Sequence, residues 1–334
     1  MHTILAIETS CDDTSIAVLH DGILLSNITY GQEVHAKYGG VVPEEASRMH
    51  MQNIYPVMQA ALQKADKTLS DITAIAVTSS PGLLGSLMVG VNFAKGLAHA
   101  LNIPLIGVNH MQAHVLSNLL MPEAPKFPFL CLTVSGGHTQ IVHCTSATQM
   151  NVVGTTIDDA AGEAFDKVAK MLGLPYPGGP LVDKHAQLGD SIAYQFAKPQ
   201  IADLNFSFSG VKTSVLYFLQ KAVKENPNFI EQNLNNICAS VQRTIVDILV
   251  AKIKKASKQF NISTICLAGG VSANSGLRAA MQYAALQYDW QVHIPDMQFC
   301  TDNGAMIGIT AHHMLQQGVQ ASSLNLSPSA RSVI

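Results

Sequence analysis

The hydrophobic and polar positions repeat one order of elements in the two halves of the chain. Residues 4–19 (ILAIETSCDDTSIAVL) predict a strand, a polar turn and a second strand, and residues 130–144 (LCLTVSGGHTQIVHC) predict the same hairpin. Residues 72–82 predict an apolar strand that ends in a Pro-Gly turn before a helix to about residue 100. Residues 262–288 likewise predict a strand, a glycine turn and a helix that begins at Ser275. The pattern indicates an internal duplication.

Each half is predicted to close on a short strand, a loop and a helix, over residues 103–120 and 292–315. The last helix, at about residues 302–317, is expected to return to the first lobe. Strands that alternate with helices behind an opening hairpin predict an α/β fold with mixed sheets.

The Pro-rich residues 122–125 are the expected junction between two lobes. The first lobe would then comprise residues 1–121 plus about 303–334, and the second residues 122–302, with the active-site cleft between them. The tail from Ser322 onward lacks periodicity and is expected to be loosely ordered.

A duplicated unit of this kind resembles the actin, sugar-kinase and heat-shock-chaperone ATPase (ASKHA) architecture. In that architecture two similar lobes face each other across a nucleotide cleft, and the turn of each opening hairpin holds phosphate. A dinucleotide-binding Rossmann unit is the rival. The first strand is not followed by G-x-G-x-x-G, and the chain has no G-x-x-x-x-G-K-[ST], so dinucleotide binding and a Walker ATPase are disfavoured.

Composition narrows the class of protein further. Hydrophobic residues make up 48% of the 334 residues and charged residues only 13%, yet every window of about 20 residues is interrupted by charges, Gly, Pro or His. With no signal peptide and no C-x-x-C among six scattered cysteines, a cytoplasmic protein that does not contact membranes is expected. At a net charge of −3, an enzyme acting on nucleic acid needs a local basic patch or a helper subunit.

Three turns carry ligand-binding chemistry. In residues 134–138 (VSGGH), two glycines let backbone N–H groups approach an anion, and residues 9–14 (TSCDDT) form the matching turn of the other half. Either could also be a plain tight hairpin. Gly269 and Gly270 precede a helix whose start favours a polar or anionic group, and Asn274 is a candidate contact to a base or ribose.

A candidate metal site begins with His110-Met-Gln-Ala-His114, since a spacing of four on a helix puts both imidazoles on one face. Met111 replaces the glutamate that an H-E-x-x-H peptidase uses as a base. The repeat adds Asp302 at the start of the second closing helix, which we expect to meet His110 across the cleft. Two His and one carboxylate suit Zn²⁺ or Fe²⁺, although Asp302 could instead only cap its helix.

Further candidates follow residue 154. Asp166 and Asp183 lie beside turns expected to rim the cleft, where carboxylates bind ribose hydroxyls, although acidic residues here could simply form a solvated helix face. Lys212, in FSFSGVKT, is expected to be available to a phosphate or an RNA backbone.

Ten blocks in order resemble the tRNA N6-adenosine threonylcarbamoyltransferase family, whose members were formerly described as glycoproteases. They are ETSCDDTS, GGVVPEEASRMH, SSPGLLGSL, VNHMQAH, SGGHTQ, TIDDAAGEAFDK, YPGGP, FSFSGVKT, AGGVSAN and CTDNGAMIG, and they run from residue 8 to residue 308.

The resemblance implies transfer of a threonylcarbamoyl group from threonylcarbamoyl-AMP to N6 of the adenosine just 3′ of the anticodon, in tRNAs that read codons beginning with A, with release of AMP. One divalent ion, Fe²⁺ or Zn²⁺, would assist, and ATP with Mg²⁺ is a further ligand of the cleft. The implied roles are metal binding by His110, His114 and Asp302; phosphate binding by Val134, Ser135, Gly136, Gly137 and His138; and adenosine binding by Asp166, Gly179, Asp183 and Asn274.

Asp12 and Asp13, on the facing turn, are the candidates for assisting proton removal. Many relatives have Glu at the position of Asp13. The implied partners are tRNA, a smaller inactive paralogue that pairs through the first lobe, and a small ATPase. A metallopeptidase, a small-molecule kinase that uses ATP and a non-enzymatic scaffold are the alternatives.

Overall fold

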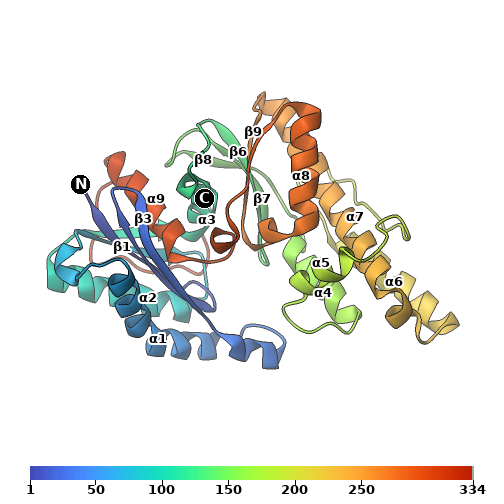
Figure 1. Ribbon diagram of the computed structural model, residues 1–334, viewed down its shortest axis with the longest axis horizontal. Helices are drawn as coiled ribbons and strands as arrows, with labels where there is room; N and C mark the ends of the chain where they lie inside the picture. Colours follow the sequence, from blue (N-terminus) through green and yellow to red (C-terminus); the bar gives the residue numbers. More distant parts are fainter. Residues whose placement is uncertain (333–334) are drawn as a thin grey trace. The chain divides into compact units, whose positions relative to one another are not determined.

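The computed structural model describes residues 1–332, and these form two compact units. Unit 1 comprises Met1–Pro125, Thr145–Met150 and Pro295–Ile334, and unit 2 comprises Lys126–Cys144 and Asn151–Ile294. Figure 1 shows one five-stranded sheet in each. Among the described residues, no helix is both long and apolar enough to cross a membrane.

The sheet of unit 1 has the strand order β3-β2-β1-β4-β5. β1 pairs antiparallel with β2 and parallel with β4, which pairs parallel with β5. The carboxyl ends of β1, β4 and β5 therefore meet at one edge. The strands are β1 (Thr3–Glu8), β2 (Asp13–His20), β3 (Ile23–Gly31), β4 (Ala74–Ser80) and β5 (Leu105–Asn109).

Helices cover both faces of this sheet because its central strand β1 is buried at every position and apolar from Ile4 to Ile7. Leu5 and Ile7 of β1 pack in a cluster with α1 and α2, whereas Ile4 and Ala6 pack in a second cluster with α3 and α9. In Figure 1, α9 lies against β1 and β3, on the face opposite α1 and α2. The helices are α1 (Pro43–Lys64), α2 (Leu84–Leu101), α3 (His110–Leu116) and α9 (Gly304–Gln316), with short 3-10 turns at Glu33–Tyr38, Leu69–Asp71, Ser117–Leu120 and Met297–Phe299.

Unit 2 repeats the motif with the strand order β10-β9-β6-β7-β8. β6 pairs antiparallel with β7 and parallel with β9. The strands are β6 (Phe129–Val134), β7 (Thr139–Cys144), β8 (Met150–Thr155), β9 (Thr264–Ala268) and β10 (Gln291–His293). The helices are α4 (Ala161–Met171), α5 (Gly178–Ala186), α6 (Ser209–Glu225), α7 (Phe229–Phe260) and α8 (Ser275–Tyr288), with a 3-10 turn at Gly270–Ala273.

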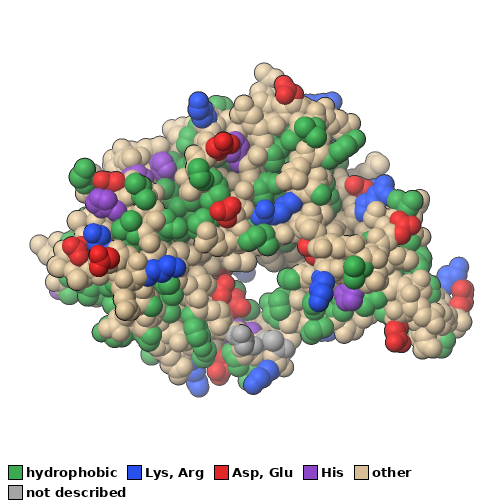
Figure 2. Space-filling view, viewed as in Figure 1, with side chains coloured by type: hydrophobic (Ala, Val, Ile, Leu, Met, Phe, Trp, Pro, Cys, Tyr) green, Lys and Arg blue, Asp and Glu red, His purple; other side chains and the backbone are tan. Residues whose placement is uncertain are grey.

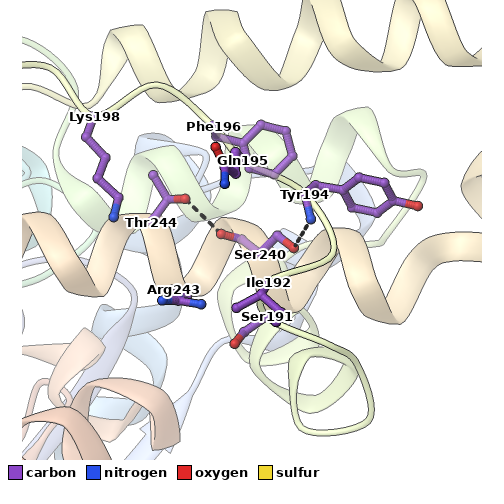
Figure 3. A pocket seen from close by; sticks show the side chains of 9 residues that line it. All are labelled: Ser191, Ile192, Tyr194, Gln195, Phe196, Lys198, Ser240, Arg243 and Thr244. Atoms are coloured by element: carbon purple, nitrogen blue, oxygen red, sulfur yellow. Dashed lines mark hydrogen bonds between the residues drawn. The ribbon is translucent and has the colours of Figure 1, made fainter.

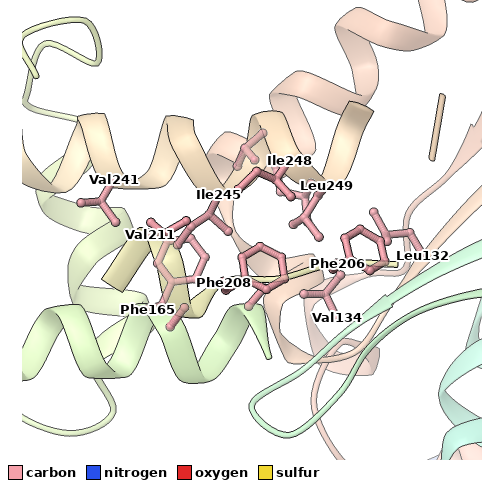
Figure 4. Close-up of a cluster of buried hydrophobic side chains, with 14 of the residues drawn as sticks. Leu132, Val134, Phe165, Phe206, Phe208, Val211, Val241, Ile245, Ile248 and Leu249 are labelled. Carbon is pink, nitrogen blue, oxygen red and sulfur yellow. The ribbon is translucent and has the colours of Figure 1, made fainter. Parts of the chain in front are cut away.

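The core of unit 2 forms where the long helix α7 lies over the sheet (Figure 4). Phe206 and Phe208 are fully buried there, between Leu132 and Val134 of β6 and the apolar face of α7. Complete burial of a Phe side chain stabilises a fold by about 2–3 kcal/mol. This packing fixes the β6–β7 turn relative to the helices that follow it.

The predicted duplication is confirmed, because both opening hairpins are antiparallel and both are followed by parallel strands. α8 has the bounds expected from the sequence. The prediction of a loose tail is wrong for the described part: the Ser322 N–H donates to the Leu105 carbonyl at 2.7 Å and the Ser329 N–H to the Ser79 carbonyl at 2.9 Å. The tail thus bonds to β5 at Ser322 and to β4 at Ser329, while residues 333–334 lie outside the described chain.

Candidate functional site

The two histidines of HMQAH are held at the edge of the first sheet, where β5 passes directly into α3. The Asn109 side chain caps this helix by accepting from the N–H groups of Met111 (2.9 Å) and Gln112 (3.1 Å). His110 and His114 lie one turn apart, with ring centroids 4.6 Å apart and planes at 85°. Residue 111 is the position of the catalytic glutamate in an H-E-x-x-H peptidase. Here it is the buried Met111, which cannot act as a base.

Asp302 reaches the same point from the other end of the chain. Its Oδ1 lies 3.1 Å from His114 Nε2 and 3.4 Å from His110 Nε2. Asn303, not Asp302, caps α9 by accepting from the Met306 N–H at 2.9 Å. The carboxylate of Asp302 therefore does not cap the helix and contacts the two histidines instead.

The three residues meet within unit 1 and not across a cleft as the repeat suggested. The physical reason is that α9 packs on β1 and β2, so the chain has already returned to unit 1 at Pro295, before Asp302.

The arrangement fits a divalent cation. His110, His114 and Asp302 each offer one ligand atom, and these atoms all lie within 4.8 Å of one another. Tetrahedral ligands about 2.1 Å from an ion are roughly 3.4 Å apart, close to the two nitrogen–oxygen distances observed. Three protein ligands with a position left open are typical of catalytic Zn²⁺ and non-haem Fe²⁺ sites.

Glu8 belongs to the same cluster, and the sequence reasoning did not find it. Its carboxylate is completely buried at the end of β1, where Oε2 lies 3.0 Å from His110 Nδ1 and accepts from Thr78 Oγ1 at 2.6 Å. The Ser10 N–H donates to Oε1. The sequence predicted both β1 and β5 as strands, but not that they end at one edge of the sheet, which is what brings the acid to the histidine.

Electrostatics tie these groups together. Burial alone would raise the pKa of Glu8 and lower that of His110, but the two groups attract each other. Attraction to Asp302 and Glu8 raises the pKa of His110 well above its usual value. Attraction to His110 lowers the pKa of Glu8, although burial and the charge of Asp302 oppose this. The pKa of Asp302 is also lowered: burial opposes this, and His110 and His114 outweigh it. The carboxylates of Glu8 and Asp302 therefore make this cluster a site that attracts cations.

The turn between β1 and β2 carries Asp12 and Asp13. His50 anchors it, because its Nε2–H donates to the Cys11 carbonyl at 2.9 Å while Nδ1 accepts from Thr14 Oγ1 at 2.8 Å. Burial, followed by the charges of Asp302, Asp12 and Glu8, raises the pKa of Asp13 to about 7. A carboxyl group with that pKa can take up a proton near neutral pH.

In unit 2 the β6–β7 turn contains the predicted phosphate binders. The Ser135 N–H donates to the His138 carbonyl at 2.8 Å, which closes the turn, and Gly136 and Gly137 are exposed. Val134 is buried against Gly269, whose φ is +83° and whose Cβ, if present, would come within 2.5 Å of the Val134 carbonyl oxygen. Only glycine fits there.

Two of the predicted adenosine binders, Asp166 and Asp183, lie within helices of unit 2 and accept from N–H groups at the starts of other helices. Asp166 Oδ1 accepts from the N–H groups of Gly178 (2.9 Å) and Gly179 (3.0 Å) at the start of α5. Asp183 accepts from the N–H (3.0 Å) and Oγ (2.6 Å) of Ser275 at the start of α8.

Asn274 caps α8 through Leu277 N–H at 2.9 Å and donates to Gln242 Oε1 at 2.7 Å. These contacts also stabilise the fold, because they hold the starts of α5 and α8 in place. They are made by Asp166, Asp183 and Asn274.

Lys212 is not available as expected. Its Nζ lies 3.2 Å from Asp159 Oδ2, and Lys167 Nζ lies 2.8 Å from Asp159 Oδ1. Asp158 is likewise occupied by Ser207, Phe208 and Ser209. These acids order the loop before α6.

A cavity of about 480 Å³ opens elsewhere in unit 2, between residues 191–198 and α7 (Figure 3). Its lining is polar, and within it the Tyr194 N–H donates to Ser240 Oγ at 3.1 Å. The cationic groups of Lys198 and Arg243 both lie near Asp247, at 2.6 and 3.8 Å. None of the predicted site residues lines it, so it is not the candidate site.

Comparison with known proteins agrees with this geometry. Residues 23–309 match the family model described as TsaD: tRNA N6-adenosine threonylcarbamoyltransferase. The chain is 58% identical to the protein of that name from Christiangramia forsetii, over 93% of this chain and 92% of the relative. It is 51% identical to the one from Cytophaga hutchinsonii, over 98% and 96%.

Among solved structures, full-length HypF in a phosphate- and nucleotide-bound form matches 96% of this chain and 47% of its own, with a TM-score of 0.63 at 13% identity. That likeness, together with the duplicated sheets, confirms the ASKHA fold. The identity of the close relatives and the extent of the family match settle the class: the chain belongs to the tRNA N6-adenosine threonylcarbamoyltransferase family and is an acyltransferase that modifies tRNA.

Proposed function

We propose that the chain uses threonylcarbamoyl-AMP as donor and a divalent metal ion as an aid. The acceptor is N6 of the adenosine just 3′ of the anticodon. The observation that carries the metal is the convergence of His110, His114 and Asp302 on one point with Glu8 behind His110. Bound there, an ion would polarise an oxygen of the donor and stabilise negative charge as it develops.

The residues of the chain perform the remaining tasks. Glu8 accepts the Nδ1 proton of His110, which leaves Nε2 as the ligand atom. The exposed backbone of Gly136 and Gly137 suits the donor phosphate, and the helix starts at Gly179 and Asn274 suit its adenosine. N6 attacks the carbamoyl carbon, the bond from that carbon to the phosphate oxygen breaks, and AMP leaves.

Asp13 is our candidate for the group that takes the N6 proton, with Asp12 beside it. The activity should rise with pH through a midpoint at or below about 7, because Asp13 must be deprotonated and a bound cation would offset the charge of Asp302. Asp13→Asn should lower the rate about 10²-fold or more and remove this rise. Initial rates of nucleoside formation between pH 5.5 and 8.5 test this; an unchanged profile in Asp13→Asn would assign the proton transfer elsewhere.

The partners are proposed as a smaller inactive paralogue and a small ATPase, acting in the cytoplasm. Apolar side chains exposed on unit 1 support a protein interface: Met51 and Tyr55 on α1, and Leu84 and Met88 on α2.

Reconstitution tests the function as a whole. We expect the chain, supplied with threonine, bicarbonate, ATP, the donor-making enzyme, both partners and unmodified tRNA, to form N6-threonylcarbamoyladenosine, detected by mass spectrometry of digested tRNA. ATP hydrolysis with phosphorylation of a small molecule that persists in His110→Ala would favour the kinase alternative. Cleavage of a sialoglycoprotein that is lost in His114→Ala would favour the peptidase.

A further inference from the structure

Basic charge is concentrated in one stretch of the chain. Residues 248–288 contain Lys252, Lys254, Lys255, Lys258 and Arg278 and no Asp or Glu. The other residues therefore carry 15 of the 20 basic side chains against all 23 acidic ones. Figure 2 shows scattered single charges on one face of the molecule and no large basic field. An enzyme with a net charge of −3 that acts on nucleic acid needs a local basic patch or a helper subunit, and this stretch is the candidate for such a patch.

The stretch forms the last turns of α7, then β9 and α8, which lie together in unit 2 (Figure 1). Between the ends of the two helices is a cavity of about 470 Å³. Its lining includes the two lysines Lys254 and Lys258, the aromatic rings of Tyr288 and Trp290, and the polar side chains of Ser257 and Asn261. We call this the α7–α8 basic surface.

The aromatic rings hold one lysine in place. Lys254 Nζ donates to the Tyr288 hydroxyl at 2.6 Å and lies 4.1 Å from the centre of that ring, which in turn is 5.2 Å from the Trp290 ring. Lys258 is exposed in the last turn of α7. In the described part of the chain, the ion pairs involve neither lysine.

The surroundings cancel only part of this charge. Lys252 and Lys255, on the neighbouring side of α7, donate to the backbone carbonyls of Ile201 and Asp203, and the exposed Asp203 carboxylate attracts Lys252. α8 adds the exposed but uncharged Tyr283 and Leu286. The nearest acid along the chain is Asp289, exposed at the end of α8.

We propose that the α7–α8 basic surface binds the sugar–phosphate backbone of the tRNA substrate, an inference that rests on the proposed function. Lysine ammonium groups that face solvent attract phosphates, and the aromatic edges in the cavity suit an adjoining ribose or base. Lysines beside aromatic rings are the combination with which RNA-binding surfaces contact backbone and base together, and tRNA is the occupant to which this proposal commits.

The surface lies away from the predicted phosphate turn. Ile262 and Ser263 precede β9, whereas Gly269 follows it, so the two ends are about 17 Å apart at roughly 3.3 Å per residue. Lys254 and Lys258 are thus positioning residues: they add affinity and orient the tRNA, and they do not touch the reacting atoms.

Trp290 makes the test local, because it is the only tryptophan of the chain and lines the cavity. Lys254→Glu/Lys258→Glu would be compared with Lys221→Glu/Lys224→Glu, two exposed lysines of α6 with the same change of charge. The probe is an unmodified tRNA transcript titrated into the full chain at several salt concentrations, with tryptophan amide as the control for absorption by RNA.

We expect tRNA to quench Trp290 fluorescence in the wild type and the α6 variant. In Lys254→Glu/Lys258→Glu the Kd should rise at least tenfold, and the slope of log K against log salt should shrink by about 1.4, at roughly 0.7 per phosphate contact. Lys254→Gln/Lys258→Gln should show the same direction with a smaller effect, which separates lost charge from reversed charge.

Equal affinity and slope in the α7 and α6 variants would overturn the proposal, as would a wild-type Trp290 signal that does not respond to tRNA. Loss of an acidic protein partner with intact tRNA binding would assign the surface to protein and also overturn it. Failure of the proposed function itself is distinguishable, because the wild-type chain would then form no modified nucleoside in the reconstituted reaction.

Discussion

Asp302→Ala should abolish tRNA modification and leave the purified chain without its metal. The variant removes the only carboxylate among the three ligand atoms that lie within 4.8 Å of one another in the described residues. It also leaves His110 and His114 facing each other, where their positive charges would repel if both were protonated. Loss of a side chain that only hydrogen-bonds to a metal ligand costs about 10–100-fold in metal affinity, so loss of a ligand itself should cost more than about 100-fold.

Metal content by mass spectrometry and nucleoside analysis of tRNA from the reconstituted reaction measure the two effects of Asp302→Ala. Asp296→Asn is the matched control, since this acid is exposed and lies six residues earlier in the same segment. An Asp302→Ala enzyme that retains full metal and full activity would remove the metal from the mechanism.

Glu8→Gln should weaken metal binding by about 10–100-fold without removing a ligand. The amide matches the carboxylate in shape, but it places an NH₂ group opposite either the Ser10 N–H or the Nδ1 of His110. In the second case His110 must carry its proton on Nε2, which then cannot bind the ion. Excess metal should restore most of the modification activity.

Titration of the metal-free protein with Zn²⁺ or Fe²⁺ measures the affinity of Glu8→Gln, with Glu44→Gln, an exposed acid of α1, as control. Unchanged affinity would show that Glu8 serves only to fill the core. Removing one partner of a buried ion pair destabilises a fold by about 3–5 kcal/mol. The melting temperature of Glu8→Gln, recorded without metal, therefore shows whether the substitution destabilises the whole fold or acts only on metal binding.

Much of the fold followed from periodicity, because strands buried on both faces are short apolar runs that end in glycine or polar turns. The pairing of His110 with Asp302 also followed, since the duplicated halves put both at the start of a closing helix. The place of this pair within unit 1 could not be predicted, because the sequence does not show that the chain returns to unit 1 by Pro295.

Two kinds of information were missing from the sequence. One is hydrogen bonding at a distance, such as that of Asp183 with Ser275 and of Asp159 with Lys212, which decides whether a polar group is available. The other is strand order. Glu8 becomes a partner of His110 only because β4 lies between β1 and β5 and all three end at one edge.

The discontinuity of unit 1 has a consequence for how the protein is made. Its second apolar face, of which Ile4 and Ala6 form part, stays uncovered until α9 leaves the ribosome, roughly 180 residues after Pro125. At about 5–20 residues per second, that interval is about 10–40 s. Unit 2 can fold in the meantime, and the centre built from His110 and Asp302 is assembled only after unit 2 has been synthesised.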